Sequence, residues 1–192
     1  MKPKILAFAG SARAGSFNKK LAAVAAMHGR TMGAEVTFVD LRDFPMPIYD
    51  GDDEARAGLP EAALRFRALL AEHQALLVAS PEHNGSVTAL LKNALDWSSR
   101  NAEGVDGLAL FRGKTVGLVA ASAGPFGGVR SVAHLRGILS KMGANVLADE
   151  VLVAGAADAF DESGRLTNAL SDQLTAQLMA QLVASAKRSD AP

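Results

Sequence analysis

The stretch Gly10-Ser11-Ala12-Arg13-Ala14-Gly15-Ser16-Phe17-Asn18 lies between an apolar run at 5–9 and a segment at 18–32 whose apolar residues have helical spacing. A short apolar run is typical of a buried parallel strand, and the spacing that follows is typical of a helix packed by one face. The quoted stretch is therefore predicted to be a turn that leads from a strand into the N-terminus of a helix.

The residue types in this turn indicate an anion-binding site. Main-chain N–H groups at a helix N-terminus have no partner within the helix, and the helix dipole places its positive end there. Ser11, Ser16 and Asn18 can add donors, and Arg13 can add a charge-assisted hydrogen bond. The same residues would also suit an ordinary turn with a Ser or Asn helix cap.

The turn lacks the signatures of two common nucleotide sites. Gly15 is followed by Ser16-Phe17, where a Walker loop needs Lys and then Ser or Thr. Only Gly10 and Gly15 are present where a dinucleotide fingerprint needs three glycines, and Asp40 alone is weak evidence for a ribose site. A hydroxyl-rich turn with one arginine fits a single terminal phosphate better than a pyrophosphate.

Composition narrows the class of protein. The 192 residues suit one domain, which we expect to span 1–186 with a flexible tail at 187–192. Without cysteine there is no disulfide, thiolate metal site or cysteine nucleophile, and no histidine has a second ligand at metal spacing. Twenty basic and twenty acidic residues give no net field for nucleic acid. The first apolar run is too short for a signal peptide or a membrane span, so we expect a cytoplasmic protein that does not bind membranes.

Strand and helix patterns alternate along the chain. Strands are predicted at 5–9, 35–40, 75–80, 114–122 and 145–153, and helices at 18–32, 61–72, about 90–97, 129–142 and 167–186. Residues 41–60 are predicted to be irregular, with the acidic run at 50–54 as a solvated loop. This alternation predicts an α/β fold, a doubly wound five-stranded parallel sheet of order 2-1-3-4-5 with helices on both faces.

The expected strand order predicts where a ligand binds. In such sheets the site lies beyond the carboxyl ends of the strands, where the order reverses. The loops after strands one, three and four should therefore converge. These loops, at 10–18, 81–85 and 123–128, are also rich in Gly, Ser, Asn and Pro.

Three stretches in these loops resemble the NADPH-dependent FMN reductase family of flavodoxin-like proteins, in the branch of quinone, azo and chromate reductases. They are Gly10-Ser-x-Arg-x-x-Ser-x-Asn18, then Pro81-Glu82-His83-Asn84-Gly85-Ser86 followed by Leu91-Lys92-Asn93-Ala94-Leu95-Asp96-Trp97, and finally Ser122-Ala-Gly124-x-x-Gly-Gly128. Each stretch follows the strand that the family pattern requires, and the resemblance covers nearly the whole chain.

The resemblance implies a flavodoxin-like fold with FMN as the cofactor. The implied phosphate ligands are Ser11, Arg13, Ser16 and Asn18, with Phe17 in the same loop. The residues implied at the isoalloxazine edge are Pro81, Glu82, His83, Asn84 and Gly85, and those near the ring or ribityl chain are Ser122 and Gly124.

The implied activity is a ping-pong reaction. NADPH or NADH would give a hydride to flavin N5, and a small-molecule acceptor such as a quinone or azo compound would then take it. No side chain is a certain catalytic group, although His83, where the family has Tyr, could donate a proton to the acceptor. The resemblance also implies a homodimer or homotetramer.

Two other functions are compatible with the fold. A flavodoxin-like electron carrier would bind FMN without reacting with nicotinamide, but such carriers usually have a strongly acidic docking face and this chain is neutral overall. A regulatory module that has lost flavin is the other alternative, and the His83 departure is the feature that supports it.

Overall fold

The computed structural model describes residues 2–189. Its single sheet has the order β2-β1-β3-β4-β5, and every neighbouring pair is parallel. The strands are β1 (Lys4–Ala9), β2 (Glu35–Asp40), β3 (Ala75–Ala79), β4 (Thr115–Ala121) and β5 (Asn145–Val153). The predicted strand order is confirmed.

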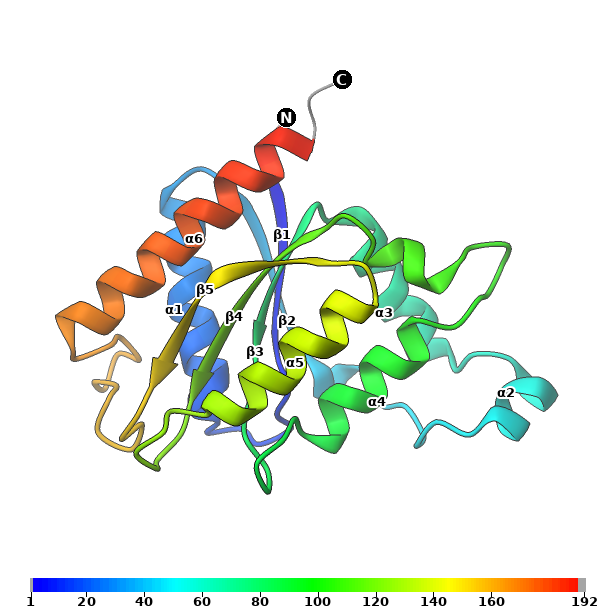
Figure 1. Ribbon diagram of the computed structural model, residues 1–192, viewed down its shortest axis with the longest axis horizontal. Helices are drawn as coiled ribbons and strands as arrows, with labels where there is room; N and C mark the ends of the chain where they lie inside the picture. The colour runs from blue at the N-terminus through cyan, green and yellow to red at the C-terminus, as the bar shows by residue number, and fades with distance from the viewer. Residues whose placement is uncertain (1, 190–192) are drawn as a thin grey trace.

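Helices cover both faces of this sheet (Figure 1). They are α1 (Phe17–Thr31), α2 (Gly51–Ala57), α3 (Glu61–Glu72), α4 (Ala89–Ser98), α5 (Val129–Lys141) and α6 (Ala169–Ser189), with short helical turns η1 (Leu41–Asp43) and η2 (Gly107–Leu110). Helices α1 and α6 lie on one face, and α3, α4 and α5 lie on the other.

The side chains of the central strands alternate between two hydrophobic cores. In β1, Ile5 and Ala7 face the core that α1 and α6 complete, whereas Leu6 and Phe8 face the core of α3, α4 and α5. All four are fully buried. Since successive residues of a strand point to opposite faces, a strand covered on both sides must be apolar throughout. This explains why the strands could be located from short apolar runs.

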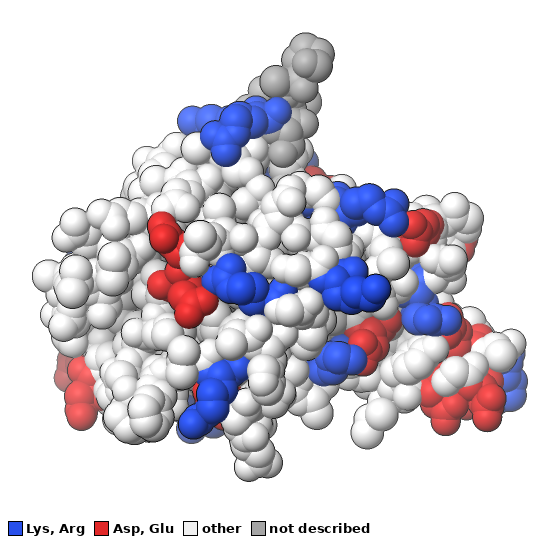
Figure 2. Space-filling view, viewed as in Figure 1, with Lys and Arg blue, Asp and Glu red and all other residues white. Residues whose placement is uncertain are grey.

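The segment at 41–60 differs from its prediction as an irregular loop. It contains η1 and the two-turn helix α2, which has no buried residue and projects from the body of the molecule (Figure 1). The Asp50 side chain caps α2 by accepting from the Asp52 N–H at 2.8 Å, and acidic residues in the first turn suit the helix dipole. The helix lacks an apolar face, so hydrophobic spacing could not detect it. Acidic side chains gather at this end of the molecule (Figure 2).

The C-terminal helix α6 also differs from its predicted bounds. It begins at Ala169 rather than at 167, and it continues to Ser189, so residues 187–189 are helical where a flexible tail was expected. The rest of the expected tail, at 190–192, lies outside the described residues.

The segment after β2 is held against α4. The Asn93 side chain accepts from the Tyr49 N–H and donates to the Pro47 carbonyl, each at 2.8 Å. The Trp97 indole N–H donates to the same carbonyl at 2.8 Å, and the rings of Tyr49 and Trp97 pack edge to face. Two residues of the second family-like stretch, Asn93 and Trp97, therefore support this segment.

A buried arginine holds the loop that follows α4. The guanidinium of Arg67 donates to the main-chain carbonyls of Ser98 at 2.6 Å, of Arg100, and of Val105 at 3.4 Å. Burial lowers the pKa of Arg67 despite the nearby charges of Glu103 and Asp106.

We expect Arg67→Ala to lower the free energy of unfolding by about 2–4 kcal/mol, because it leaves these carbonyls without their charged donor. Chemical denaturation measures the change. The matched control is Arg112→Ala, which removes an exposed ion pair with Asp106 at 3.4 Å and should cost less than about 1 kcal/mol. Equal losses in the two variants would contradict the structural role of Arg67.

Candidate active site

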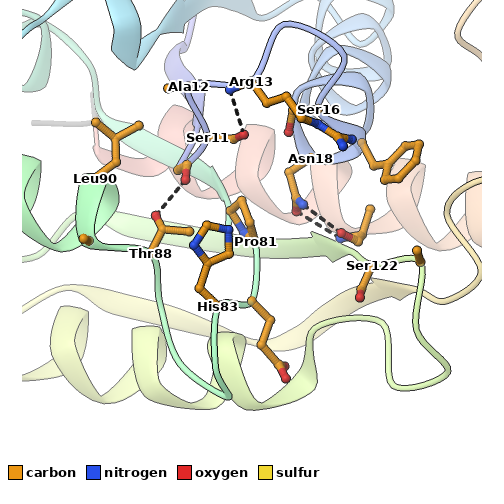
Figure 3. Close-up of a pocket in the computed structure, with 16 residues that line it drawn as sticks. Ser11, Ala12, Arg13, Ser16, Asn18, Pro81, His83, Thr88, Leu90 and Ser122 are labelled. Atoms are coloured by element: carbon orange, nitrogen blue, oxygen red, sulfur yellow. Dashed lines mark hydrogen bonds between the residues drawn. The ribbon is translucent and has the colours of Figure 1, made fainter.

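Three loops at the carboxyl edge of the sheet surround a cavity of about 520 Å³ (Figure 3). We call them the β1 loop (10–16), the β3 loop (80–88) and the β4 loop (122–128). The cavity also reaches the first residues of α1 and α4. Its size is in the range of sites for small molecules and cofactors, and it lies where the strand order reverses.

The cavity brings together nine of the twelve residues that the sequence proposed for the site. These are Ser11, Arg13, Ser16, Phe17, Asn18, Pro81, Glu82, His83 and Ser122. The imidazole of His83, between Pro81 and Thr88 in Figure 3, lines the cavity and is exposed to solvent.

The other three, Asn84, Gly85 and Gly124, do not line the cavity. Asn84 and Gly85, with φ values of 51° and 78°, form the tip of a tight turn between His83 and Ser86, whose main chains exchange two hydrogen bonds of 3.0 Å. The Gly124 carbonyl accepts from Gly155 N–H at 3.3 Å, so this part of the β4 loop faces the segment after β5.

The N-terminus of α1 is arranged for an anion. Its first turn contains no acidic residue and carries Lys19 and Lys20, although cations are unfavourable at that end of a helix dipole. Within residues 2–189, no group accepts a hydrogen bond from the main-chain N–H of Ala12, Phe17 or Asn18. A bound anion would supply the missing acceptor and the missing negative charge.

Arg13 adds a cation beside this helix end. Its guanidinium donates to the Gly15 carbonyl at 2.9 Å and lies 5.1 Å from the centre of the Phe17 ring. The Phe17 ring in turn stacks parallel to Phe160, with ring centres 6.4 Å apart. The guanidinium is exposed, so these two contacts hold it in place while leaving donors free.

Two of the polar residues in the β1 loop and α1 have a structural role. Ser16 is the N-cap of α1, and its hydroxyl accepts from Lys19 N–H at 3.5 Å. The buried Asn18 side chain donates to the Ala121 carbonyl at 2.7 Å and accepts from the Ala121 N–H at 3.0 Å. The side chain of Asn18 thus links α1 to the end of β4, which differs from its expected role as a phosphate donor. Its main-chain N–H still faces the cavity end of the helix.

Thr88 links the β3 loop to the β1 loop. Its hydroxyl donates to the Gly10 carbonyl at 2.7 Å and accepts from Leu91 N–H at 3.2 Å as the N-cap of α4. The main chains lie close here, since a Cβ on Gly10 would be 2.8 Å from Leu91 Cβ. Only glycine fits at the first position of the β1 loop.

Glu82 links the β3 loop to α5. Its carboxylate accepts from the Arg130 N–H at 3.1 Å, the Ser131 N–H at 3.4 Å and the Arg130 Nε at 2.7 Å. Burial would raise the pKa of Glu82, but the hydrogen bonds from Arg130 and Ser131 outweigh it and hold the pKa below its ordinary value of 4.5. The contact therefore stabilises the fold at neutral pH and is lost as the pH falls through the lowered native pKa.

Helices α1, α4 and α5 begin at the loops around the cavity, and the protein itself caps the N-termini of α4 and α5. Helix α5 begins after Gly128, which offers no side-chain cap, and receives the carboxylate of Glu82 instead. Helix α1 receives no carboxylate. An anionic ligand is accordingly expected at α1.

Asp40 and two of the histidines have partners outside the cavity. Asp40 pairs with Lys19 at 2.6 Å and with Arg42 at 3.2 Å, so its carboxylate is occupied. His28 contacts Asp172, and the buried His73 contacts Thr37 and Leu69. Within residues 2–189, no three His, Cys, Asp or Glu side chains are placed to hold a metal ion, and no helix is long and apolar enough to cross a membrane.

Seven lining residues were not among the sequence candidates. They are Gly10, Ala12, Thr88, Ala89, Leu90, Ala121 and Ala123. Most contribute main chain or small apolar surface, which residue type alone cannot identify. Thr88 was detectable, because a helix cap directly after a ligand loop must lie at the same edge of the sheet.

Comparisons with known proteins agree with this geometry. The family described as NADPH-dependent FMN reductase matches residues 3–158. A NAD(P)H-dependent FMN reductase of Pseudomonas aeruginosa is 38% identical over 173 residues, which are 89% of this chain and 88% of that protein. A quinone reductase of Pseudomonas putida is 35% identical over 161 residues, covering 83% of this chain and 82% of that protein.

A solved structure has a fold similar to that of this chain. The flavoenzyme NAD(P)H:(acceptor) oxidoreductase FerB from Paracoccus denitrificans superposes with a TM-score of 0.81, covering 97% of this chain and 98% of that one. At 24% sequence identity this likeness shows the shared flavodoxin-like fold.

The close contact between Gly10 and Leu91 can be tested by measuring protein stability. We expect Gly10→Ala to lower the free energy of unfolding by about 1–3 kcal/mol, because the added Cβ overlaps Leu91 and displaces the β1 loop. Gly15→Ala is the matched control in the same loop, since its Cβ would enter open space, and it should change stability by less than about 1 kcal/mol. Thermal unfolding without ligand measures both, and a fully tolerated Gly10→Ala would contradict the close contact.

Proposed function

Because the chain belongs to the NADPH-dependent FMN reductase family, we propose that it binds FMN in the cavity between the β1, β3 and β4 loops and reduces quinone-type acceptors with NADPH or NADH. The relatives named above are described as FMN and quinone reductases. The observation that carries the proposal is the N-terminus of α1, which has unpaired N–H groups and no acidic residue beside a cavity of cofactor size.

The FMN phosphate would lie at the N-terminus of α1. Main-chain N–H groups at the start of the helix and the hydroxyls of Ser11 and Ser16 would donate to its oxygens. Arg13 would pair with the phosphate, its guanidinium already held by Gly15 and Phe17. Asn18 would support this arrangement through its side-chain contacts with β4 rather than through a side-chain bond to the ligand.

The ring would lie toward Pro81, His83 and Ser122, which line the cavity on the β3 and β4 loops. When bound, FMN would supply the redox chemistry, taking a hydride from the nicotinamide and returning it to the acceptor. The chain's own residues would bind and orient the participants. His83, exposed at the cavity, would give a proton to a reduced acceptor.

Three parts of the proposal go beyond the site. Quinones are the acceptor class that the relatives' names support, whereas azo compounds remain a prediction from sequence. A cytoplasmic location and a homodimer or homotetramer also remain predictions.

The test of function is a flavin titration of the purified protein, followed by addition of NADPH and then of benzoquinone under anaerobic conditions. We expect bound FMN to lose its visible absorbance with NADPH or NADH and to regain it with the quinone. Bound FMN that neither nucleotide reduces would indicate an electron carrier. Failure to bind FMN would refute the proposal.

The phosphate contact of Arg13 can be tested separately. Arg13→Ala should weaken FMN binding by about 1–3 kcal/mol, the range for a lost charge-assisted hydrogen bond. Riboflavin, which lacks the phosphate, should bind both proteins equally, and flavin fluorescence quenching measures all four affinities. An unchanged FMN affinity, or an equal loss for riboflavin, would show that Arg13 does not contact the phosphate.

A further inference from the structure

The carboxylate of Glu82 turns away from the ligand-binding part of the β3 loop and into α5. It accepts hydrogen bonds from the main-chain N–H groups of Arg130 and Ser131 and from the Arg130 Nε, and these are the second and third residues of that helix. The Glu82 side chain is 9% exposed, so it lies in the seam between the β3 and β4 loops rather than on the surface.

A second contact follows the same seam. The buried hydroxyl of Ser131 donates to the Pro81 carbonyl at 2.8 Å and lies 2.5 Å from the hydroxyl of Ser80. Two consecutive residues of the β3 loop, Pro81 and Glu82, are thus bonded to the first turn of α5. The position of that turn determines where the preceding β4 loop ends.

The end of the β4 loop supplies no side-chain cap for α5. Gly127 and Gly128 both have positive φ values, and α5 begins without a side-chain cap of its own. A Cβ on Gly128 would lie 2.8 Å from Ala120 Cβ, so the loop also passes close to β4. Because the β4 loop gives α5 no side-chain cap, the N-terminus of α5 receives one from outside the loop, and Glu82 supplies it.

We propose that Glu82 is a positioning residue. By capping α5 from the β3 loop, it keeps the β3 and β4 loops at a fixed separation beside the part of the cavity where the ring would bind. The statement about the ring rests on the function proposed above, whereas the link between the loops does not. Glu82 takes the place of an anion at α5, and the resulting spacing between Pro81 and Ser122 sets the room available for a flat ring.

The first test is amide hydrogen exchange of the ligand-free protein. In Glu82→Ala we expect exchange to become at least about tenfold faster at 122–126, a segment whose main-chain N–H groups make no bond with Glu82. Glu82→Gln keeps one carbonyl oxygen for the helix but loses the ion pair, so we expect a smaller change in the same direction. This variant carries the test if Glu82→Ala does not fold.

The matched control is Glu54→Gln. Glu54 also pairs with an arginine from another segment, Arg100 at 2.9 Å, and it does not line the cavity. We expect unchanged exchange at 122–126 in this variant. Unchanged exchange there in the folded Glu82 variants as well would overturn the proposed link.

The second test distinguishes an effect on the ring end of the flavin from an effect on its phosphate end. Glu82→Ala should weaken the binding of riboflavin and of FMN by the same factor, at least about tenfold, because it alters the ring end alone. The visible circular dichroism of bound FMN should change in the Glu82 variants and stay unchanged in Glu54→Gln. A loss confined to FMN would overturn the proposal. Absence of flavin binding in the unaltered protein would refute the proposed function and leave the exchange comparison to decide the role of Glu82.

Discussion

Three hydrogen-bonded contacts hold together the loops and helix ends around the cavity. Thr88 joins the β3 loop to Gly10 of the β1 loop, Asn18 joins α1 to Ala121 at the end of β4, and Glu82 joins the β3 loop to α5. Thr88 links two loops directly, whereas Asn18 and Glu82 act through the helices beside the loops. Each of the three side chains bonds main-chain groups, so these contacts determine where the backbone lies. The cavity depends on this closed arrangement.

The arrangement exists because of the sheet. Parallel strands place their carboxyl ends at one edge, and the reversal of strand order leaves a gap there between neighbouring connections. The helices that follow β1 and β4 begin at this edge and bring unpaired N–H groups with them. The protein satisfies those of α5 with Glu82 and leaves those of α1 open. On the proposed function, this difference determines which end of the cavity would accept the phosphate of FMN.

The sequence predicted most of the architecture, because buried strands and amphipathic helices leave clear hydrophobic patterns. The hydrophobic pattern did not predict α2, because this helix is stabilised by the Asp50 cap and by charges rather than by a buried face. The sequence located the loops of the site but not the directions of their side chains. Asn18 and Glu82 line the cavity as expected, but their side chains also contact partners about 50 residues or more away in the chain. Such pairings become visible only in three dimensions.

The central claim is that the loops are already in place before the cofactor binds. A crystal structure of the protein with FMN tests it most directly. The account predicts the phosphate at the N-terminus of α1, the ring between the β3 and β4 loops, and shifts of less than about 1 Å in the three loops. The contacts of Thr88, Asn18 and Glu82 should be unchanged. A phosphate bound elsewhere, or loops that rearrange and break these contacts, would contradict it.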